Sequence, residues 1–310
     1  MPIKHLVISG GGQNGIKSLG ILKELWDKSF WNITDIKTIY ATSAGSLISL
    51  LLILETDIDT ITNYILNRPW HEAYPIDISQ IFDMYKNKGF FGNNITEIFF
   101  KPFLDSKDLP LTITMQELFE YSGIELHIFS LEINDFKIAD ISHKSFPNLP
   151  VLTAIHMSIA IPIVISPVCL DNKCYIDGGM INNYPLQYCL DQNPKPDINE
   201  ILGLRNHAHN EFSNITTEST IVDFLIHFTN KILYQVDTEL TQLIISNEVN
   251  YNSHYLTLQT LSNALYSSTV RKELFNDGIQ IGKEFLENKK NKAFEENKEF
   301  EDNKLLVIDH

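Results

Sequence analysis

The chain has 310 residues, of which 44% are hydrophobic and 20% are charged, as is ordinary for a globular protein with one or two domains. Its 39 acidic and 24 basic residues give a formal net charge of −15. This acidity argues against a nucleic-acid-binding protein, which needs a basic face, and against electrostatic docking on anionic lipid. Any contact with a membrane has to be apolar or local.

The cysteines and the N-terminal residues bear on the cellular compartment of the protein. The three cysteines, Cys169, Cys174 and Cys189, contain no C-x-x-C pair, which fits a reducing compartment and offers no metal site. The N-terminus runs directly into an apolar strand, so it is not a signal peptide, and no apolar run is long enough to span a bilayer. We therefore expect a cytoplasmic protein without a metal or cofactor.

The chain begins with a short apolar strand over residues 5–9, a glycine turn and a helix over residues 16–26. The glycines of the turn are Gly10, Gly11, Gly12 and Gly15. Backbone N–H groups point outward at the start of a helix, so this turn can bind an anion.

Three kinds of anion site compete for the glycine turn. Its spacing satisfies the dinucleotide-binding fingerprint, but the next strand does not end in the acidic residue that this fingerprint requires. A P-loop fails by one residue, because Ile16 separates Gly15 from Lys17. The third interpretation is an oxyanion hole for a serine one strand away, at Ser43. We prefer it because it explains this glycine turn together with the turn that contains Ser43.

A second strand–turn–helix unit follows, with a strand over residues 34–41 that runs parallel to the first and a helix over residues 47–54. Ser43 lies at the apex of the turn between them, which is the geometry of a nucleophile elbow. The N-terminus of the following helix favours the negative charge that acyl transfer creates. The pattern is G-x-S-x-G with Ala41 in the first glycine position. The alternative is a serine in an ordinary turn.

Residues 55–125 are predicted to be mostly helical, and residues 126–132 and 136–141 to be a pair of strands. Two aromatic stretches, residues 69–71 and 89–92, can form a lipid-facing lip or belong to the core, and we favour the core. A short helix over residues 152–160 must stop before the next proline.

A strand over residues 173–176 leads into Asp177-Gly178-Gly179. An acid at the end of a strand, followed by two glycines, has a backbone that can bend close to another element, although the same tripeptide is also a common turn. A carboxylate of ordinary pKa is a weak base, so a catalytic Asp177 should lie in a partly desolvated pocket. Residues 198–205 are predicted as the last strand of the sheet, and residues 220–285 as two or three helices.

Four motifs occur in one order: Gly10-Gly11-Gly12-x-x-Gly15, Thr42-Ser43-Ala44-Gly45, Ser158-x-Ala160-x-Pro162, and Asp177-Gly178-Gly179 with Asn183-x-Pro185. In this order and spacing, over about residues 3–205, the chain resembles the patatin-like phospholipase family. The chain departs from the family pattern at Asn14, where Arg or Lys is usual, and at Ala41, where Gly is usual.

The resemblance implies an α/β fold, namely a three-layer α/β/α sandwich with a mostly parallel central sheet. It implies a catalytic domain over residues 1–210 and a helical C-terminal part over residues 211–310 that packs on the same domain and ends in a charged tail. Carried over to this sequence, Ser43 is the nucleophile and Asp177 the general base. The turn amides of Gly10, Gly11, Gly12 and Gly15 form the oxyanion hole, whereas substrate-binding residues and the oligomeric state are not predicted.

The implied function is a calcium-independent lipid acyl hydrolase, of the phospholipase A or lysophospholipase type, that contacts membranes transiently and forms an acyl-enzyme. Three alternatives remain. An α/β-hydrolase triad would use a late histidine, His207 or His209. A catalytically silent member would bind lipid or a partner, and an acyltransferase would use an acceptor other than water.

Overall fold

The computed structural model describes residues 2–55, 57–75, 86–92, 94–192, 194–208, 214–239, 245–253 and 256–308. The strands are β1 (His5–Ile8), β2 (Thr38–Thr42), β3 (Gly89–Phe91), β4 (Glu125–Glu132), β5 (Lys137–Ile141), β6 (Ile163–Ile165), β7 (Val168–Leu170), β8 (Lys173–Asp177), β9 (Ile201–Ala208) and β10 (Glu248–Ser253). The helices are α1 (Gly15–Asp27), α2 (Ala44–Leu54), α3 (Ile58–Asn67), α4 (Trp70–Ala73), α6 (Ile95–Ser106), α7 (Met115–Ser122), α8 (Val151–Ile159), α9 (Leu186–Leu190), α10 (Ile221–Glu239), α11 (Leu258–Tyr266) and α12 (Ser268–Ile308).

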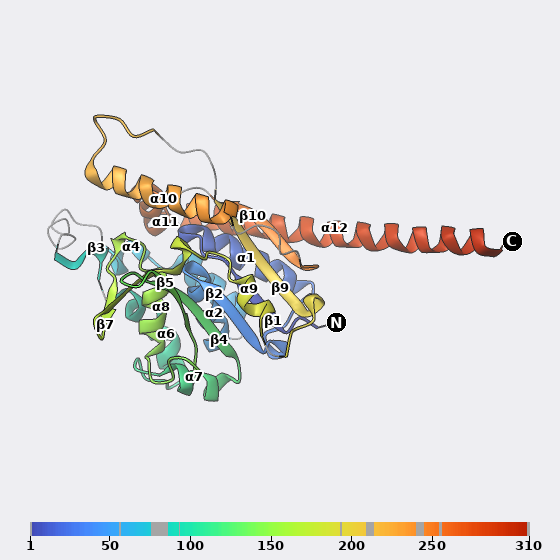
Figure 1. The fold of residues 1–310 in the computed structure, drawn as a ribbon, viewed down its shortest axis with the longest axis horizontal. Helices are drawn as coiled ribbons and strands as arrows, with labels where there is room; N and C mark the ends of the chain where they lie inside the picture. Colours follow the sequence, from blue (N-terminus) through green and yellow to red (C-terminus); the bar gives the residue numbers. More distant parts are fainter. Residues whose placement is uncertain are drawn as a thin grey trace.

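The central sheet has the strand order β10-β9-β1-β2-β4-β8-β7, and β5 pairs separately with β4 (Figure 1). The pairs β10–β9, β9–β1, β1–β2 and β2–β4 are parallel, whereas β5, β7 and β8 are antiparallel to their neighbours. The prediction of an α/β fold with a mostly parallel sheet is therefore confirmed. A second, two-stranded sheet pairs β3 with β6.

The central parallel strands β1 and β2 are buried at every position, so both faces of the sheet are covered there. Alternate residues of β1 enter different cores: Leu6 and Ile8 face the larger core, which includes side chains of α1, α2, α6 and α8. Val7 faces a smaller core, to which α9 contributes Leu186. The sheet thus lies between two layers, which gives the predicted three-layer α/β/α arrangement.

The prediction that the sheet ends at residues 198–205 is wrong, because β10 adds a further parallel strand beside β9. The sequence of β10 alternates: Val249 and Tyr251 are buried, whereas Asn250 and Asn252 are exposed. A strand at the edge of a sheet can carry polar residues on its outer side, so it lacks the continuous apolar run that identifies a buried strand. The part of the chain beyond residue 210 is therefore not helical throughout.

Helix α12 packs against α1 and then extends away from the body of the protein (Figure 1). The two helices approach so closely that a Cβ at Gly20 would lie 2.2 Å from the Phe275 carbonyl oxygen, and one at Gly278 would lie 2.1 Å from that of Lys17. Only glycine permits this contact, which joins the first helix of the chain to the last.

Cys169 and Cys174 form a disulfide that joins β7 to β8. The two cysteines are five positions apart, and the antiparallel pairing of β7 with β8 places them opposite each other. Because structural disulfides are rare in reducing compartments, the argument from the cysteine count does not hold, and the compartment stays a prediction. Within the described ranges, no helix is both long and apolar enough to cross a bilayer.

Candidate active site

Ser43 lies in the tight turn between β2 and α2, with a φ of 52° and a ψ of −126°. Residues other than glycine rarely adopt this φ, and strained residues of this kind cluster at functional sites. Gly45 allows the turn to close, because a Cβ there would lie 2.4 Å from the carbonyl oxygen of Ile8 in β1. Ala41 lies inside β2 with its side chain fully buried, so its methyl group packs in the core and leaves the turn undisturbed.

The structure brings Ser43 and Asp177 together, although they are 134 positions apart in the chain. The Ser43 hydroxyl donates a hydrogen bond of 2.5 Å to Asp177 Oδ2, and the Gly179 N–H donates one of 2.8 Å to the other carboxylate oxygen. Asp177 is 2% exposed, and burial raises its pKa to about 7, against the opposing effect of the two hydrogen bonds. A carboxylate with this pKa can accept a proton near neutral pH.

Ser158 binds the backbone of the turn at Ser43. Its motif, Ser158-x-Ala160-x-Pro162, is visible in the sequence, but this contact is not. Its hydroxyl accepts a hydrogen bond of 2.8 Å from the Ser43 N–H and donates one of 2.7 Å to the Phe129 carbonyl. The strained backbone of Ser43 is thereby connected to β4.

Replacing Ser158 by alanine leaves the buried N–H of Ser43 without an acceptor, which costs about 1–3 kcal/mol. We expect the variant to fold with a lower unfolding midpoint and a kcat reduced about 10-fold, because the hydroxyl of Ser43 is then held less firmly. The matched control is Ser18→Ala, which removes another fully buried serine hydroxyl, bonded to Tyr251, away from the turn. Equal kcat values for the two variants, measured on a soluble ester, would contradict this role.

The glycine turn after β1 lies against Ser43, since a Cβ at Gly10 would be 2.8 Å from the Cβ of Ser43. The four predicted oxyanion donors are not equivalent. The Gly10 N–H donates to the Asn183 carbonyl at 3.2 Å, and the Gly15 N–H donates to carbonyls within its own turn, so neither is directed at a substrate. Among the described residues, the N–H groups of Gly11 and Gly12 have no acceptor.

Asn14, which replaces the basic residue usual in the family pattern, is buried within the turn. Its side-chain amide donates to the Gly11 carbonyl at 3.2 Å, and the residue is 1% exposed. The side chain therefore stabilises the glycine turn and presents no cation to a ligand.

The histidine alternative finds no support in the described part of the chain. The Nε2 atom of His207 lies 2.7 Å from Asn250 Oδ1, and the partner of the Ser43 hydroxyl is a carboxylate and not an imidazole. His209 lies outside the described residues. The described residues also contain no group of three or more His, Cys, Asp or Glu side chains arranged as a metal site.

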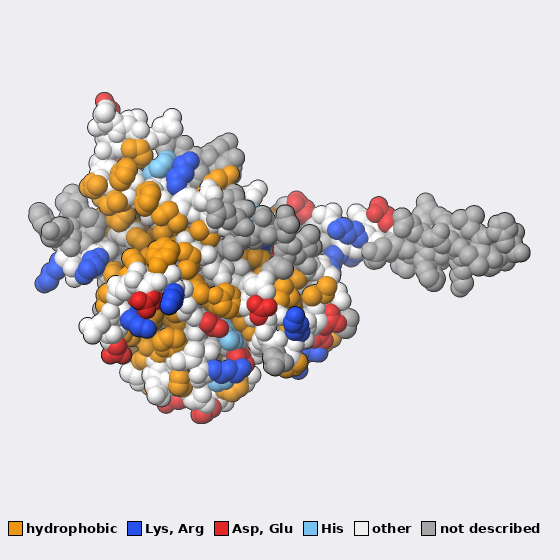
Figure 2. Space-filling model, in the orientation of Figure 1, with side chains coloured by type: hydrophobic (Ala, Val, Ile, Leu, Met, Phe, Trp, Pro, Cys, Tyr) orange, Lys and Arg blue, Asp and Glu red, His pale blue; other side chains and the backbone are white. Residues whose placement is uncertain are grey.

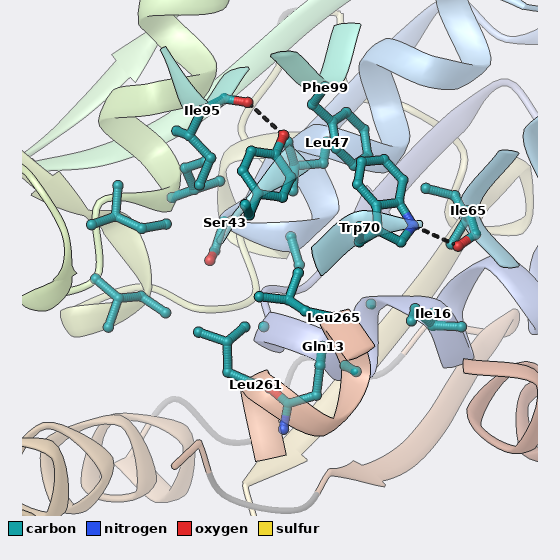
Figure 3. Close-up of a pocket in the computed structure, with 18 of the residues that line it drawn as sticks. Gln13, Ile16, Ser43, Leu47, Ile65, Trp70, Ile95, Phe99, Leu261 and Leu265 are labelled. Atoms are coloured by element: carbon teal, nitrogen blue, oxygen red, sulfur yellow. Dashed lines mark hydrogen bonds between the residues drawn. The ribbon is translucent and has the colours of Figure 1, made fainter. Parts of the chain in front are cut away.

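An apolar pocket of about 220 Å³ opens at Ser43 (Figure 3). Its wall combines residues from α2, α3, α4, β3, α6, β6 and α11, among them Leu47, Trp70, Phe91, Phe99, Val164, Leu261 and Leu265. The polar atoms of its aromatic residues are satisfied in the wall: Trp70 Nε1 donates to the Ile65 carbonyl at 2.8 Å, and the Tyr74 hydroxyl to the Ile95 carbonyl at 2.7 Å. The cavity therefore presents an almost wholly apolar surface beside one reactive hydroxyl.

The two aromatic stretches of the sequence, residues 69–71 and 89–92, contribute Trp70 and Phe91 to this pocket. Trp70 and Phe91 are 4% and 8% exposed and belong to one aromatic cluster, as the core interpretation predicts. This cluster is also the wall of the cavity. Leu261 and Leu265 of α11 come from a part of the chain in which no sequence pattern pointed to a site.

Comparisons with known proteins relate the chain to one family and one fold. A sequence model of the family described as Patatin-like phospholipase matches residues 6–190. The chain is similar to the probable lipid hydrolase 463L of Invertebrate iridescent virus 6, with 28% identity over 189 residues, or 60% of this chain and 63% of that protein. It is also similar to the uncharacterized protein R571 of Acanthamoeba polyphaga mimivirus, with 26% identity over 224 residues, or 72% of each chain.

Among solved structures, VipD from Legionella pneumophila has a TM-score of 0.55 and 16% sequence identity, covering 92% of this chain and 67% of that chain. At this identity the likeness shows the fold alone. The match to the iridescent virus protein leaves more than a third of that relative uncovered. The family match extends from β1 to α9 and so includes both Ser43 and Asp177.

Proposed function

The chain belongs to the patatin-like phospholipase family, and from this premise we propose that it is a lipid acyl hydrolase in which Ser43 and Asp177 form a catalytic dyad. One observation carries the proposal, namely the 2.5 Å hydrogen bond from the Ser43 hydroxyl to Asp177 at the end of an apolar pocket. A buried serine bonded to a carboxylate of raised pKa is an activated nucleophile with its base in place.

In the proposed reaction, Asp177 takes the proton of the Ser43 hydroxyl while the Ser43 oxygen attacks the ester carbonyl carbon. The negative charge on the carbonyl oxygen is stabilised by the N–H groups of Gly11, Gly12 and Ala44, the last of which begins α2. Asp177 then returns the proton to the oxygen of the departing alcohol, and the acyl group remains on Ser43. Water, deprotonated by Asp177, attacks the acyl carbonyl carbon, the bond to the Ser43 oxygen breaks, and Asp177 returns the proton to that oxygen as the fatty acid leaves.

The proposed substrate is a fatty-acyl ester of a phospholipid or lysophospholipid, and the apolar lining of the pocket supports the fatty-acyl part. Burial of each methylene group contributes about 0.8 kcal/mol, so an apolar cavity beside Ser43 selects long acyl chains. The oxyanion donors are backbone N–H groups, so we expect the reaction to need no calcium. The test is release of fatty acid from phosphatidylcholine and lysophosphatidylcholine by the purified protein in the presence of EDTA, and no release from either lipid would contradict the proposal.

Helix α10 supports the expected transient contact with a membrane. Ile221, Phe224 and Phe228 are exposed at spacings that place them on one side of the helix, and hydrophobic side chains gather over α10 in Figure 2. Asn230 of the same helix exchanges two hydrogen bonds with the backbone of Leu256, which lines the pocket. An apolar contact of this kind suits a protein with a net charge of −15, because it does not depend on anionic lipid.

Narrowing the pocket should change the preferred length of the acyl chain. We expect Leu261→Trp to lower kcat/KM about 10-fold for long-chain esters, through lost burial of about two methylene groups, and to leave short-chain esters nearly unaffected. The matched control is Asn263→Trp, which places the same indole on the exposed side of α11. The measurement is kcat/KM over a series of p-nitrophenyl esters, and a parallel loss for all chain lengths would contradict this assignment of the pocket.

Transfer of the acyl group to another acceptor uses the same acyl-enzyme, so hydrolysis and transfer differ only in the second step. Adding a lipid alcohol to the assay separates them, because an acyltransferase would form a new ester in place of free fatty acid. Ala41 and Asn14 are the departures that raise the alternative of a silent member. The Ala41 methyl group packs in the core, and Asn14 Nδ2 donates to the Gly11 carbonyl, so both positions are compatible with the glycine turn and the elbow that the structure shows.

A further inference from the structure

We propose that Asn206, in β9, is a positioning residue that directs the Gly11 N–H toward the substrate oxyanion; this inference rests on the proposed function. Asn206 lies beyond residues 6–190, which the family sequence model matches, and outside the four sequence motifs. It is 3% exposed, and its side chain reaches across from β9 to the glycine turn after β1.

Two hydrogen bonds fasten Asn206 to the end of β1. Its side-chain Nδ2 donates to the Gly10 carbonyl oxygen at 2.8 Å, and its backbone N–H donates to the Ser9 hydroxyl at 3.1 Å. The amide also lies directly against the next residue, because a Cβ at Gly11 would be 2.5 Å from Nδ2. Asn206 therefore contacts both residues that form the Gly10–Gly11 peptide.

The direction of this peptide follows from its geometry. A trans peptide is planar, so the N–H of Gly11 points opposite to the carbonyl of Gly10. Asn206 draws that carbonyl toward β9, which is one neighbour of β1 in the sheet, whereas β2 is the other neighbour. The Gly11 N–H consequently points to the side of β1 on which β2 ends at Ser43.

Within the described part of the chain, two side chains are seen to donate to the Gly10 carbonyl, and Asn206 is the closer. The other is Asn183 Nδ2, at 3.4 Å, and the Asn183 carbonyl accepts the Gly10 N–H at 3.2 Å. Without Asn206, the carbonyl keeps one longer hydrogen bond, so it is not left unpaired but its direction is less firmly held. Without Asn206 we therefore expect the glycine turn to form but the Gly11 N–H to be poorly oriented toward the substrate oxyanion.

The test compares Asn206→Ala and Asn206→Leu with the wild-type protein and with Ser43→Ala. Leucine keeps the branched shape of asparagine and removes only its hydrogen-bonding atoms, and Asn206 Oδ1 has no partner among the described residues. We expect kcat for a soluble ester to fall about 10- to 100-fold in both variants, with KM within about twofold of wild type. The rate of labelling by a fluorophosphonate, whose phosphoryl oxygen occupies the oxyanion position, should fall in parallel.

The matched control is Asn247→Ala. Asn247 is 4% exposed, and its Nδ2 also donates to a backbone carbonyl at 2.8 Å, that of Asn199, but it lies near the opposite end of β9. If Asn206 has only a structural role, the Asn206 variants and Asn247→Ala should both lower the unfolding midpoint, and their kcat values should be equal. An unchanged kcat in the Asn206 variants, or an equal loss in Asn247→Ala, would overturn the proposal.

A second readout does not depend on catalysis. In protein labelled with nitrogen-15 glycine, the amide resonance of Gly11 should move in both Asn206 variants and stay in place in Asn247→Ala. A wild-type protein without Ser43-dependent hydrolysis would refute the proposed function. The Gly11 resonance would still decide whether Asn206 orients this peptide, and an unmoved resonance would refute the inference.

Discussion

Replacing Ser43 by alanine is expected to abolish ester hydrolysis, with a loss in kcat/KM of about 10⁴-fold or more. The hydroxyl is the only group of the pocket that the proposed mechanism uses as a nucleophile, and its oxygen is already bonded to the carboxylate that accepts its proton. The measurement is release of fatty acid from phosphatidylcholine, together with a thermal unfolding curve to show that the variant is folded.

Ser49→Ala is the control for this experiment. Ser49 is a fully buried serine of α2, the helix that follows Ser43, and its hydroxyl donates to the Gly45 carbonyl at 2.7 Å. The control should lose stability modestly and keep kcat/KM within a few fold of wild type. Residual fatty-acid release by Ser43→Ala at the level of Ser49→Ala would show that the nucleophile lies elsewhere.

Replacing Asp177 by asparagine should lower kcat about 10³- to 10⁴-fold, because an amide cannot accept the serine proton. Asparagine has the same shape and keeps an acceptor for the Gly179 N–H, so we expect the fold to be retained. Asp171→Asn is the control, since Asp171 is exposed in the turn between β7 and β8. A variant at Asp177 that retains wild-type kcat would exclude this carboxylate as the base.

The raised pKa of Asp177 predicts two pH profiles. Catalysis needs the carboxylate, so kcat/KM of the wild type should rise up to a pH of about 7 and level off above it. Stability should change in the opposite sense. Burial raises the pKa from 3.8 to about 7, so between these values the folded protein holds a proton that the unfolded chain releases.

The stabilising effect of this proton is fully present below pH 4 and is lost as the pH rises to about 7. Relative to Asp177→Asn, the free energy of unfolding of the wild type should therefore fall by roughly 1.4 kcal/mol per pH unit across this range. Urea unfolding of both proteins from pH 5 to pH 8 measures the difference. A difference that is independent of pH would contradict the raised pKa.

The two residues of the proposed dyad could be singled out from sequence because each lies in a local signal. Ser43 follows a strand within a run of small residues, and Asp177 is followed by two glycines. The strands that carry them were also recognisable from their apolar runs. No local pattern gives the distance between the Ser43 and Asp177 side chains. That distance depends on the strand order β2-β4-β8 in the sheet.

The rest of the site depends on contacts between distant segments. Asn206 is one polar residue in the last predicted strand, and it acquires a role only because β9 pairs with β1. Leu261 reaches the pocket because α11 packs against α4 and the glycine turn, and hydrophobic periodicity does not report such a contact. Strand β10 was not predicted because its polar outer residues interrupt the apolar pattern. The disulfide was not predicted because only the pairing of β7 with β8 places the two cysteines opposite each other.

We propose the Ser43 hydroxyl, activated by Asp177, as the nucleophile. The most direct test of this proposal is to treat the wild type, Ser43→Ala and Asp177→Asn with a fluorophosphonate and to locate the adduct by peptide mass spectrometry. We expect one adduct per wild-type chain, on Ser43, none in Ser43→Ala, and greatly slowed labelling in Asp177→Asn. An adduct on another residue, or equal labelling rates in the wild type and Asp177→Asn, would contradict it.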